Sequence, residues 1–274
     1  MRTSQEYEGT LPGGLPYLAI GSGDPLVFLC GSTPEHRNPR PGVERAMTRR
    51  MIRPLAEAGF EVYFTNRWPG MAPDTTFAMV AERHADAIAE RFGRPVPVIG
   101  HSTGGSLALQ LIADRPEVVD KAVVASAAYT LGPVAKRSQL KLLHAIEETG
   151  RYSTEAIVDG LAGMIRFRWL CRALTPVAAL AARRIRIANP TDAATMLRAE
   201  DAFDVRDRLT GIPTETLVIC GARDYYWTPE MFAETAFRMP RGRLIMYPDR
   251  GHAIPVRPEF ARDVVSFLRE DSST

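Results

Sequence analysis

Ser102 has the sequence surroundings of a nucleophile. It is the central residue of a Gly-x-Ser-x-Gly pattern at residues 100–104, between an apolar, strand-like run and a helix-period run that begins near Leu107. A strand that turns abruptly into a helix exposes the serine hydroxyl above a sheet. Gly100 and Gly104 carry no Cβ atoms that would collide in so sharp a corner. Because the bare pattern arises by chance in roughly one chain in ten of this length, its meaning depends on partners elsewhere.

A serine hydroxyl needs a base to remove its proton, and a third group to orient that base. The candidate base is His252, which lies between a strand expected over 243–247 and a helix expected over 258–269. A residue in that position can overhang the edge of the sheet where parallel strands end. We therefore predict that His252 activates Ser102.

The other four histidines have different interpretations. His84 lies on the apolar stripe of an expected helix, which indicates a packing role, and His144 falls in a helical insertion. His101 adjoins Ser102 in sequence, so its side chain points away from the serine and is expected to be structural. His36 lies in the loop after the first buried strand, and it is the candidate substrate-binding residue.

The candidate for the orienting acid is Asp224. The apolar run 217–220 ends in a short loop that carries this carboxylate ahead of a helix start at Thr228-Pro229. Asp249 is nearer to His252 in sequence, but a separation of three residues within one turn rarely places an acid on the far nitrogen of the imidazole. It is the alternative.

Acyl transfer also needs donors aimed at the developing oxyanion. One expected donor is the backbone N–H of Thr103, which follows the nucleophile at a helix N-terminus. The second is expected from the loop after the strand at 25–30, at Ser32 or at Gly31. We name Ser32 as the candidate and leave Gly31 open.

Strands and helices alternate along most of the chain, and the strands read as continuous apolar runs. This alternation is typical of a parallel sheet covered by helices. Two short strands at 7–11 and 15–20 precede it. The expected strands are 25–30, 60–65, 96–99, 121–125, 215–220 and 243–247, and the expected helices include 43–58, 76–92, 228–239 and 258–269.

Residues 128–211 contain no strand-like run, and we expect an all-helical insertion there. One helix is expected behind a Thr154 cap, and another from Thr175-Pro176. The first carries an i, i+4 stripe of Ile157, Leu161, Ile165 and Trp169. The predicted domains are therefore a core at 1–127 and 212–274, interrupted by a helical insertion at 128–211.

The bulk composition excludes several classes. A net charge of +2 over 274 residues does not indicate nucleic-acid binding, and no run of 18 apolar residues predicts a membrane span. The N-terminus lacks the apolar core of a signal peptide. The three cysteines (Cys30, Cys171 and Cys220) are scattered and odd in number. Two of them, Cys30 and Cys220, end apolar strand-like runs and are expected to be buried free thiols, as in a cytoplasmic protein. No motif indicates a metal or a cofactor, and we expect neither.

The chain order Ser102, Asp224, His252 resembles that of the α/β-hydrolase superfamily, and the resemblance extends from about residue 15 to residue 269. It implies an α/β fold with an eight-stranded, mostly parallel sheet and helices on both faces. It also implies that the helical insertion caps the site. One departure is Cys30-Gly31, where many members have His-Gly. The contacts that hold this loop must therefore differ.

A serine nucleophile points to acyl transfer, whereas relatives that open epoxides or displace halide use an aspartate. We expect a hydrolase of a small apolar ester or lactone. Alternatives with the same triad are thioesterases, C–C hydrolases and non-hydrolytic cyclases or lyases of secondary metabolism. A non-catalytic ligand-binding member of the fold is a further alternative. The insertion holds 13 basic and 9 acidic residues. This excess indicates solvated helix faces, an anionic substrate, or an acidic protein partner such as an acyl carrier.

Overall fold

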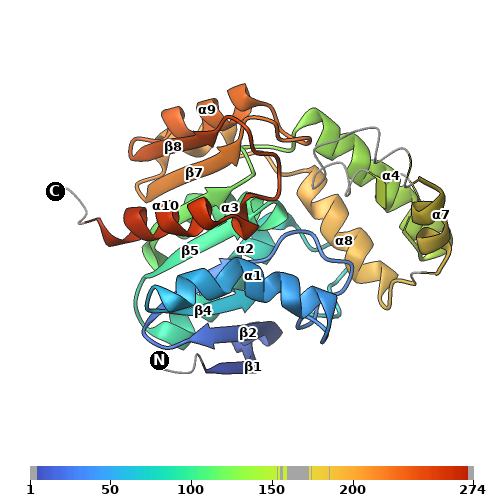
Figure 1. Ribbon diagram of the computed structural model, residues 1–274, viewed down its shortest axis with the longest axis horizontal. Coiled ribbons are helices and arrows are strands. Elements are labelled where there is room, and N and C mark those ends of the chain that lie inside the picture. Colours follow the sequence, from blue (N-terminus) through green and yellow to red (C-terminus); the bar gives the residue numbers. More distant parts are fainter. Residues whose placement is uncertain are drawn as a thin grey trace.

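Eight strands form one sheet in the order β1-β2-β4-β3-β5-β6-β7-β8. The computed structural model describes residues 5–152, 154, 157–158, 173, 175–184 and 186–270 (Figure 1). β2 is antiparallel to both β1 and β4, and all the other pairs are parallel. The strands are β1 (Glu6–Leu11), β2 (Leu15–Gly21), β3 (Asp24–Leu29), β4 (Phe60–Thr65), β5 (Val96–His101), β6 (Val119–Ala125), β7 (Glu215–Gly221) and β8 (Gly242–Tyr247).

Helices cover both faces of this sheet, which confirms the predicted α/β class. On one face, α2, α3 and α9 pack in the largest apolar cluster, and on the other α1 and α10 pack in a second cluster. Short 3-10 helices connect some elements. The core helices are α1 (Val43–Glu57), α2 (Phe77–Phe92), α3 (Thr103–Asp114), α9 (Pro229–Arg238) and α10 (Pro258–Arg269), with 3-10 turns η1 (Pro12–Gly14), η2 (Pro116–Val118) and η4 (Ile254–Val256).

Local capping explains why several helices begin and end where they do. The Thr76 and Thr228 side chains accept from backbone N–H groups in the first turns of α2 and α9. Gly93 ends α2 in the left-handed conformation, at φ 63°. The predicted strand at 96–99 extends to His101, because Gly100 and His101 remain paired with β6. In the sequence, Gly100 indicated the end of the strand, but the pairing with β6 continues through Gly100 to His101.

The described part of the insertion is helical and lies at one side of the sheet (Figure 1). Isolated bridges join Thr130 to Asp204 and Arg151 to Arg186. Leu161, Ile165 and Trp169 of the predicted stripe, and Cys171, lie outside the described residues. The described elements are α4 (Pro133–Thr149), α7 (Thr175–Arg184), α8 (Pro190–Asp201) and η3 (Arg206–Gly211).

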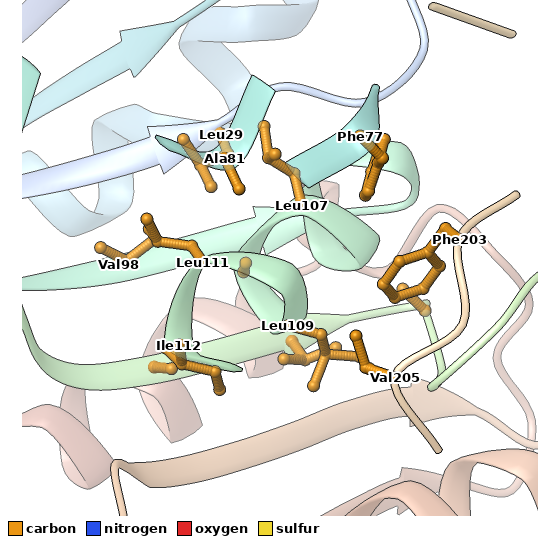
Figure 2. Packing of buried hydrophobic residues seen from close by; sticks show 14 of the residues in the cluster. Leu29, Phe77, Ala81, Val98, Leu107, Leu109, Leu111, Ile112, Phe203 and Val205 are labelled. Carbon is orange, nitrogen blue, oxygen red and sulfur yellow. The ribbon is translucent and has the colours of Figure 1, made fainter. Parts of the chain in front are cut away.

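Helix α8 is joined to the core at its first turn and by the segment that follows it. The Asp192 carboxylate accepts from the N–H groups of Gly70 (2.8 Å) and Met71 (2.7 Å). Beyond α8, Phe203 packs against Phe77 with ring centroids 5.1 Å apart. Figure 2 shows Phe203 and Val205 among the side chains of the main core. The insertion therefore returns to the sheet through buried apolar contacts.

Two of the three cysteines, Cys30 and Cys220, are buried free thiols in the described structure. Among the described residues, no helix is long and apolar enough to cross a membrane.

Truncation of Phe203 should test how strongly the insertion depends on this anchor. Phe203 is 2% exposed, and Phe203→Ala should lower the free energy of unfolding by about 3 to 5 kcal/mol through lost burial and a residual cavity. The measurement is urea unfolding followed by circular dichroism. Phe237→Ala is the matched control, because Phe237 is 72% exposed and should change stability by less than about 0.5 kcal/mol. Equal effects of both substitutions would contradict the anchor.

Candidate active site

Ser102 occupies a strained corner between β5 and α3. Its φ is 56°, one of two positive φ values at non-glycine residues in the described chain. A Cβ atom on Gly100 would stand 1.9 Å from the Gly104 carbonyl oxygen, and one on Gly104 would stand 2.1 Å from the Leu29 oxygen. Both glycines are therefore required sterically, as predicted. The backbone N–H of Ser102 donates to Ala125 O at 2.9 Å, which fixes the corner against β6.

The serine, the histidine and the aspartate expected from the sequence meet in one hydrogen-bonded line. Nε2 of His252 lies 3.0 Å from Ser102 Oγ, and Nδ1 of His252 lies 2.9 Å from Asp224 Oδ2. An imidazole that donates Nδ1–H to a carboxylate presents Nε2 as an acceptor for the serine proton. His252 is 9% exposed, and the Asp224 side chain is fully buried. The arrangement can remove a proton from Ser102 and return it.

Asp224 is held in place by backbone N–H groups that follow it in the same loop. Its Oδ1 accepts from the N–H groups of Tyr226 (2.8 Å) and Trp227 (3.3 Å), which leaves Oδ2 for His252. Asp249, the alternative acid, instead forms an exposed ion pair with Arg223 at 2.7 Å. The structure therefore places Asp224, and not Asp249, on the imidazole.

The loop that carries His252 is fixed through its backbone carbonyl. Ser126 Oγ donates to His252 O at 2.9 Å, and Nε2–H of His101 donates to the same oxygen at 3.2 Å. Burial lowers the pKa of His101 to about 3, so this histidine is neutral and structural, as expected. The Trp227 ring lies parallel to the His252 ring, with centroids 5.7 Å apart, and its Nε1–H donates to Thr130 O.

Arg67 supplies the contacts that hold the unusual Cys30-Gly31 loop. It is 2% exposed and follows β4. Its Nη1 donates to Gly31 O at 2.7 Å and lies 3.2 Å from Cys30 Sγ. The backbone N–H of Cys30 donates to Thr65 O. The buried guanidinium of Arg67 therefore holds the loop that is expected to carry the second oxyanion donor.

His36 does not line the substrate cavity, contrary to the expectation from its position in the loop. Its side chain is buried, and Nδ1 donates to Trp68 O at 3.0 Å. Burial, together with the positive charge of Arg67, lowers its pKa to about 4. The loop backbone turns this ring towards the core, while the neighbouring Glu35 and Arg37 side chains reach the cavity.

The remaining histidines have the roles that their helical positions indicated. His84 is buried on α2, where Nδ1 donates to Val80 O at 2.8 Å, and burial lowers its pKa to about 4. His144 is exposed on α4 and pairs with Glu148. Neither contacts the Ser102 site. Within the described residues, no three histidine, cysteine or acidic side chains gather as metal ligands.

Glu200 of α8 reaches the residue that follows the nucleophile. Its Oε2 accepts a hydrogen bond from Thr103 Oγ1 at 3.0 Å, and both side chains are buried. Burial raises the pKa of Glu200 to about 7. The charge of Arg67 and the hydrogen bond from Thr103 act in the opposite direction. A titratable carboxyl group from the insertion therefore lies directly behind the expected oxyanion site.

A cavity of about 550 Å³ opens over Ser102 and His252, and its lining is mostly apolar. One side is formed by the loop after β3, α1 and the end of β4, and the other by α4, the segment before it, and α8. The first side contributes Pro34, Met47, Met51 and Phe64, and the second contributes Leu131, Leu142, Leu197, Gln139 and Glu200.

A mostly parallel eight-stranded sheet that carries a serine, an aspartate and a histidine at its strand ends defines the α/β-hydrolase class. The sequence model of the Alpha/beta hydrolase family matches residues 26–264. The chain belongs to this family.

Similar proteins agree with this assignment. The protein named "Putative carbamate hydrolase RutD" of Caulobacter vibrioides is 29% identical over 175 residues, which span 62% of this chain and 64% of that protein. A hydrolase from Pseudomonas aeruginosa PA01 superposes with a TM-score of 0.72 at 21% identity, covering 97% of this chain and 99% of its own. The enol-lactonase of Burkholderia xenovorans LB400 gives 0.70 at 19% identity, over 96% and 100%. At these identities the two structures show a shared fold.

Sequence reasoning missed four residues that support the site: Arg67, Ser126, Trp227 and Glu200. Arg67 and Trp227 follow or lie between strand and helix signals, so a listing of all polar and aromatic residues at strand ends would have included them. Ser126 follows β6 in the same way. Glu200 had no such signal, because it is one acid among nine in the insertion.

Titration of Glu200 should make stability depend on pH. Because the folded pKa is raised to about 7 from 4.5, stability from the neutral carboxyl is full below about pH 4.5 and is lost as pH rises through 7. The free energy of unfolding should fall across this interval by up to about 3 kcal/mol. Glu200→Gln should remove that component.

The measurement is urea unfolding at pH 5, 6, 7 and 8. Glu148→Gln is the matched control, since the Glu148 side chain is 59% exposed, and its profile should follow that of the unmodified protein. A Glu200→Gln profile parallel to that of the unmodified protein would count against a buried neutral carboxyl group.

Proposed function

We propose that this α/β hydrolase is a serine hydrolase that cleaves a small, largely apolar ester or lactone by acyl transfer. The observation that carries the proposal is the continuous line from Ser102 Oγ through His252 to Asp224, at 3.0 Å and 2.9 Å. This line opens into the mostly apolar cavity. A ligand-binding member of the fold would need the cavity but not the aligned proton relay.

In the proposed reaction, Ser102 Oγ attacks the acyl carbon while His252 Nε2 takes the serine proton. His252 then protonates the leaving oxygen, and the acyl group stays on Ser102. Water, deprotonated by the same imidazole, attacks the acyl-enzyme and releases the acid. Asp224 keeps the imidazole in the required tautomer and stabilises its cation.

The negative oxygen of each tetrahedral intermediate is proposed to bind to backbone N–H groups. Thr103 is the first residue of α3, so its N–H has no partner within the helix. The second donor is Ser32 or Gly31, in the loop that Arg67 holds. Donors fixed before the reaction avoid a reorganisation cost when the charge develops.

The mostly apolar lining of the cavity supports a neutral acyl substrate with apolar groups. Charged side chains at its loop side are already paired, since Arg37 contacts both Glu35 and Glu44. The RutD relative is named for carbamates, and a carbamate is an acyl substrate that the same three residues could attack. Carbamates are therefore the second substrate class to be tested.

Replacement of the nucleophile is the direct test of acyl chemistry. The folded protein should be labelled covalently by a fluorophosphonate probe, and Ser102→Ala should abolish the labelling because no other serine lies against His252 Nε2 in the described structure. Intact-protein mass spectrometry measures the adduct. Ser22→Ala, at an exposed turn, is the matched control and should label at the unmodified rate. Persistent labelling of Ser102→Ala would refute the assignment.

A substrate panel separates the proposed activity from its alternatives. The protein should hydrolyse short-chain p-nitrophenyl esters and small lactones faster than p-nitrophenyl carbamates, acyl thioesters or vinylogous 1,5-diketones. Initial rates give kcat/KM for each class, with Ser102→Ala as the background control. A preference for carbamates would assign the second class. Probe labelling without turnover of any ester or lactone would favour a specialised C–C hydrolase, thioesterase or cyclase.

A further inference from the structure

Glu200 is placed where helix α8 of the insertion meets the first turn of α3. It is 2% exposed and lies one residue before the end of α8, while Asp192 ties the start of the same helix to the core. Helix α8 is thus fixed at both ends by buried carboxyl groups. One of them contacts the loop after β4, and the other contacts the residue that follows the nucleophile.

The hydrogen bond from Thr103 Oγ1 to Glu200 Oε2 constrains a residue with a second function. Thr103 follows the strained Ser102, and its backbone N–H is the expected oxyanion donor. A side chain fixed at 3.0 Å by a buried partner limits rotation of the residue that carries that N–H. The two partners come from distant parts of the chain, because Glu200 is 97 positions further along than Thr103.

An ionised Glu200 carboxylate would repel the negative oxyanion. Glu200 can therefore position Thr103 without this cost only when the carboxyl group is neutral or when a nearby positive charge compensates its charge. The groups that face it are Thr103 and Ser106 on α3, Gln139 on α4, and Arg67 in the loop after β4. Burial favours the neutral form, and Arg67 supplies positive charge for any ionised fraction. The neutral and the ionised carboxyl group each keep an oxygen that accepts the hydrogen bond from Thr103 Oγ1.

We propose that Glu200 is a positioning residue of the oxyanion site, which holds the Thr103 N–H in place through the Thr103 hydroxyl and so couples the helical insertion to the reaction centre. This inference rests on the proposed serine-hydrolase function. It assigns to the insertion a role in transition-state stabilisation, in addition to that of forming one wall of the cavity.

A double-mutant cycle tests the coupling, with the rate of covalent labelling by a fluorophosphonate probe as the readout. Removing a whole oxyanion donor costs about 10²- to 10³-fold, so displacement of one should cost about tenfold. Glu200→Leu, which loses the acceptor, and Thr103→Val, which loses only the hydroxyl, should each slow labelling by that factor. The double variant should be no slower than either single variant, because both remove the same interaction.

Conservative variants separate positioning from general disruption. Glu200→Gln and Thr103→Ser keep the acceptor and the hydroxyl, so each should label within about threefold of the unmodified rate, below the tenfold effect of losing a partner. With a p-nitrophenyl ester, the Leu and Val variants should lower kcat and leave KM unchanged. Circular dichroism melting checks folding. If Glu200→Leu does not fold, the isosteric Thr103→Val decides alone.

The outcomes are distinct. Three results would each overturn the positioning role. They are a double variant whose labelling rate falls by the product of the two single effects, a Glu200→Gln variant as slow as Glu200→Leu, and a Thr103→Val variant that labels at the unmodified rate. In all three cases, labelling of the unmodified protein would still support the serine-hydrolase function. If the unmodified protein were not labelled at Ser102, the proposed function would fail first, and the positioning role would fail with it.

Discussion

The sharp corner at Ser102 is the constraint on which the rest of the site depends. Its positive φ is unfavourable for a residue with a Cβ atom, and persists only because the surroundings enforce it. Gly100 and Gly104 permit the close approach of β5, α3 and β3, and the ladder to β6 holds the Ser102 N–H. Every other element of the site is arranged around the hydroxyl that this corner presents.

Buried polar groups, rather than further apolar packing, hold the loops around that hydroxyl. Arg67 holds the loop at Gly31, Ser126 and His101 hold the carbonyl of His252, and Glu200 holds Thr103. A hydrogen bond in a buried, low-dielectric environment is electrostatically stronger than one in water, so each of these contacts favours one loop geometry. Two of these contacts bear on the two expected oxyanion donors. The positive charge of Arg67 also acts on Glu200 and His36, where it favours a lower pKa for both side chains.

The insertion contributes to the site in two physically different ways. Its apolar residues on α4 and α8 form one side of the cavity, which decides the size of what can bind. Its acids Asp192 and Glu200 fix α8 against the core. The insertion has an excess of basic residues, which suggested an anionic partner such as an acyl carrier. Among the described residues that line the cavity, none of the basic side chains comes from the insertion, and Arg37 of the loop after β3 is paired with Glu35 and Glu44. This lining supports the proposal of a neutral acyl substrate.

The sequence alone determined the class, the order of strands and helices, and the three side chains that meet at Ser102. Each of these is encoded locally, by apolar runs, caps, glycines and polar residues at strand ends, and parallel strands bring their ends together. Only the tertiary structure decided the orientation of His36 and the roles of Arg67 and Glu200. These depend on which side chain fills the space between segments 32 to 97 positions apart. No local pattern encodes such a contact, because its free energy exists only once both segments have packed.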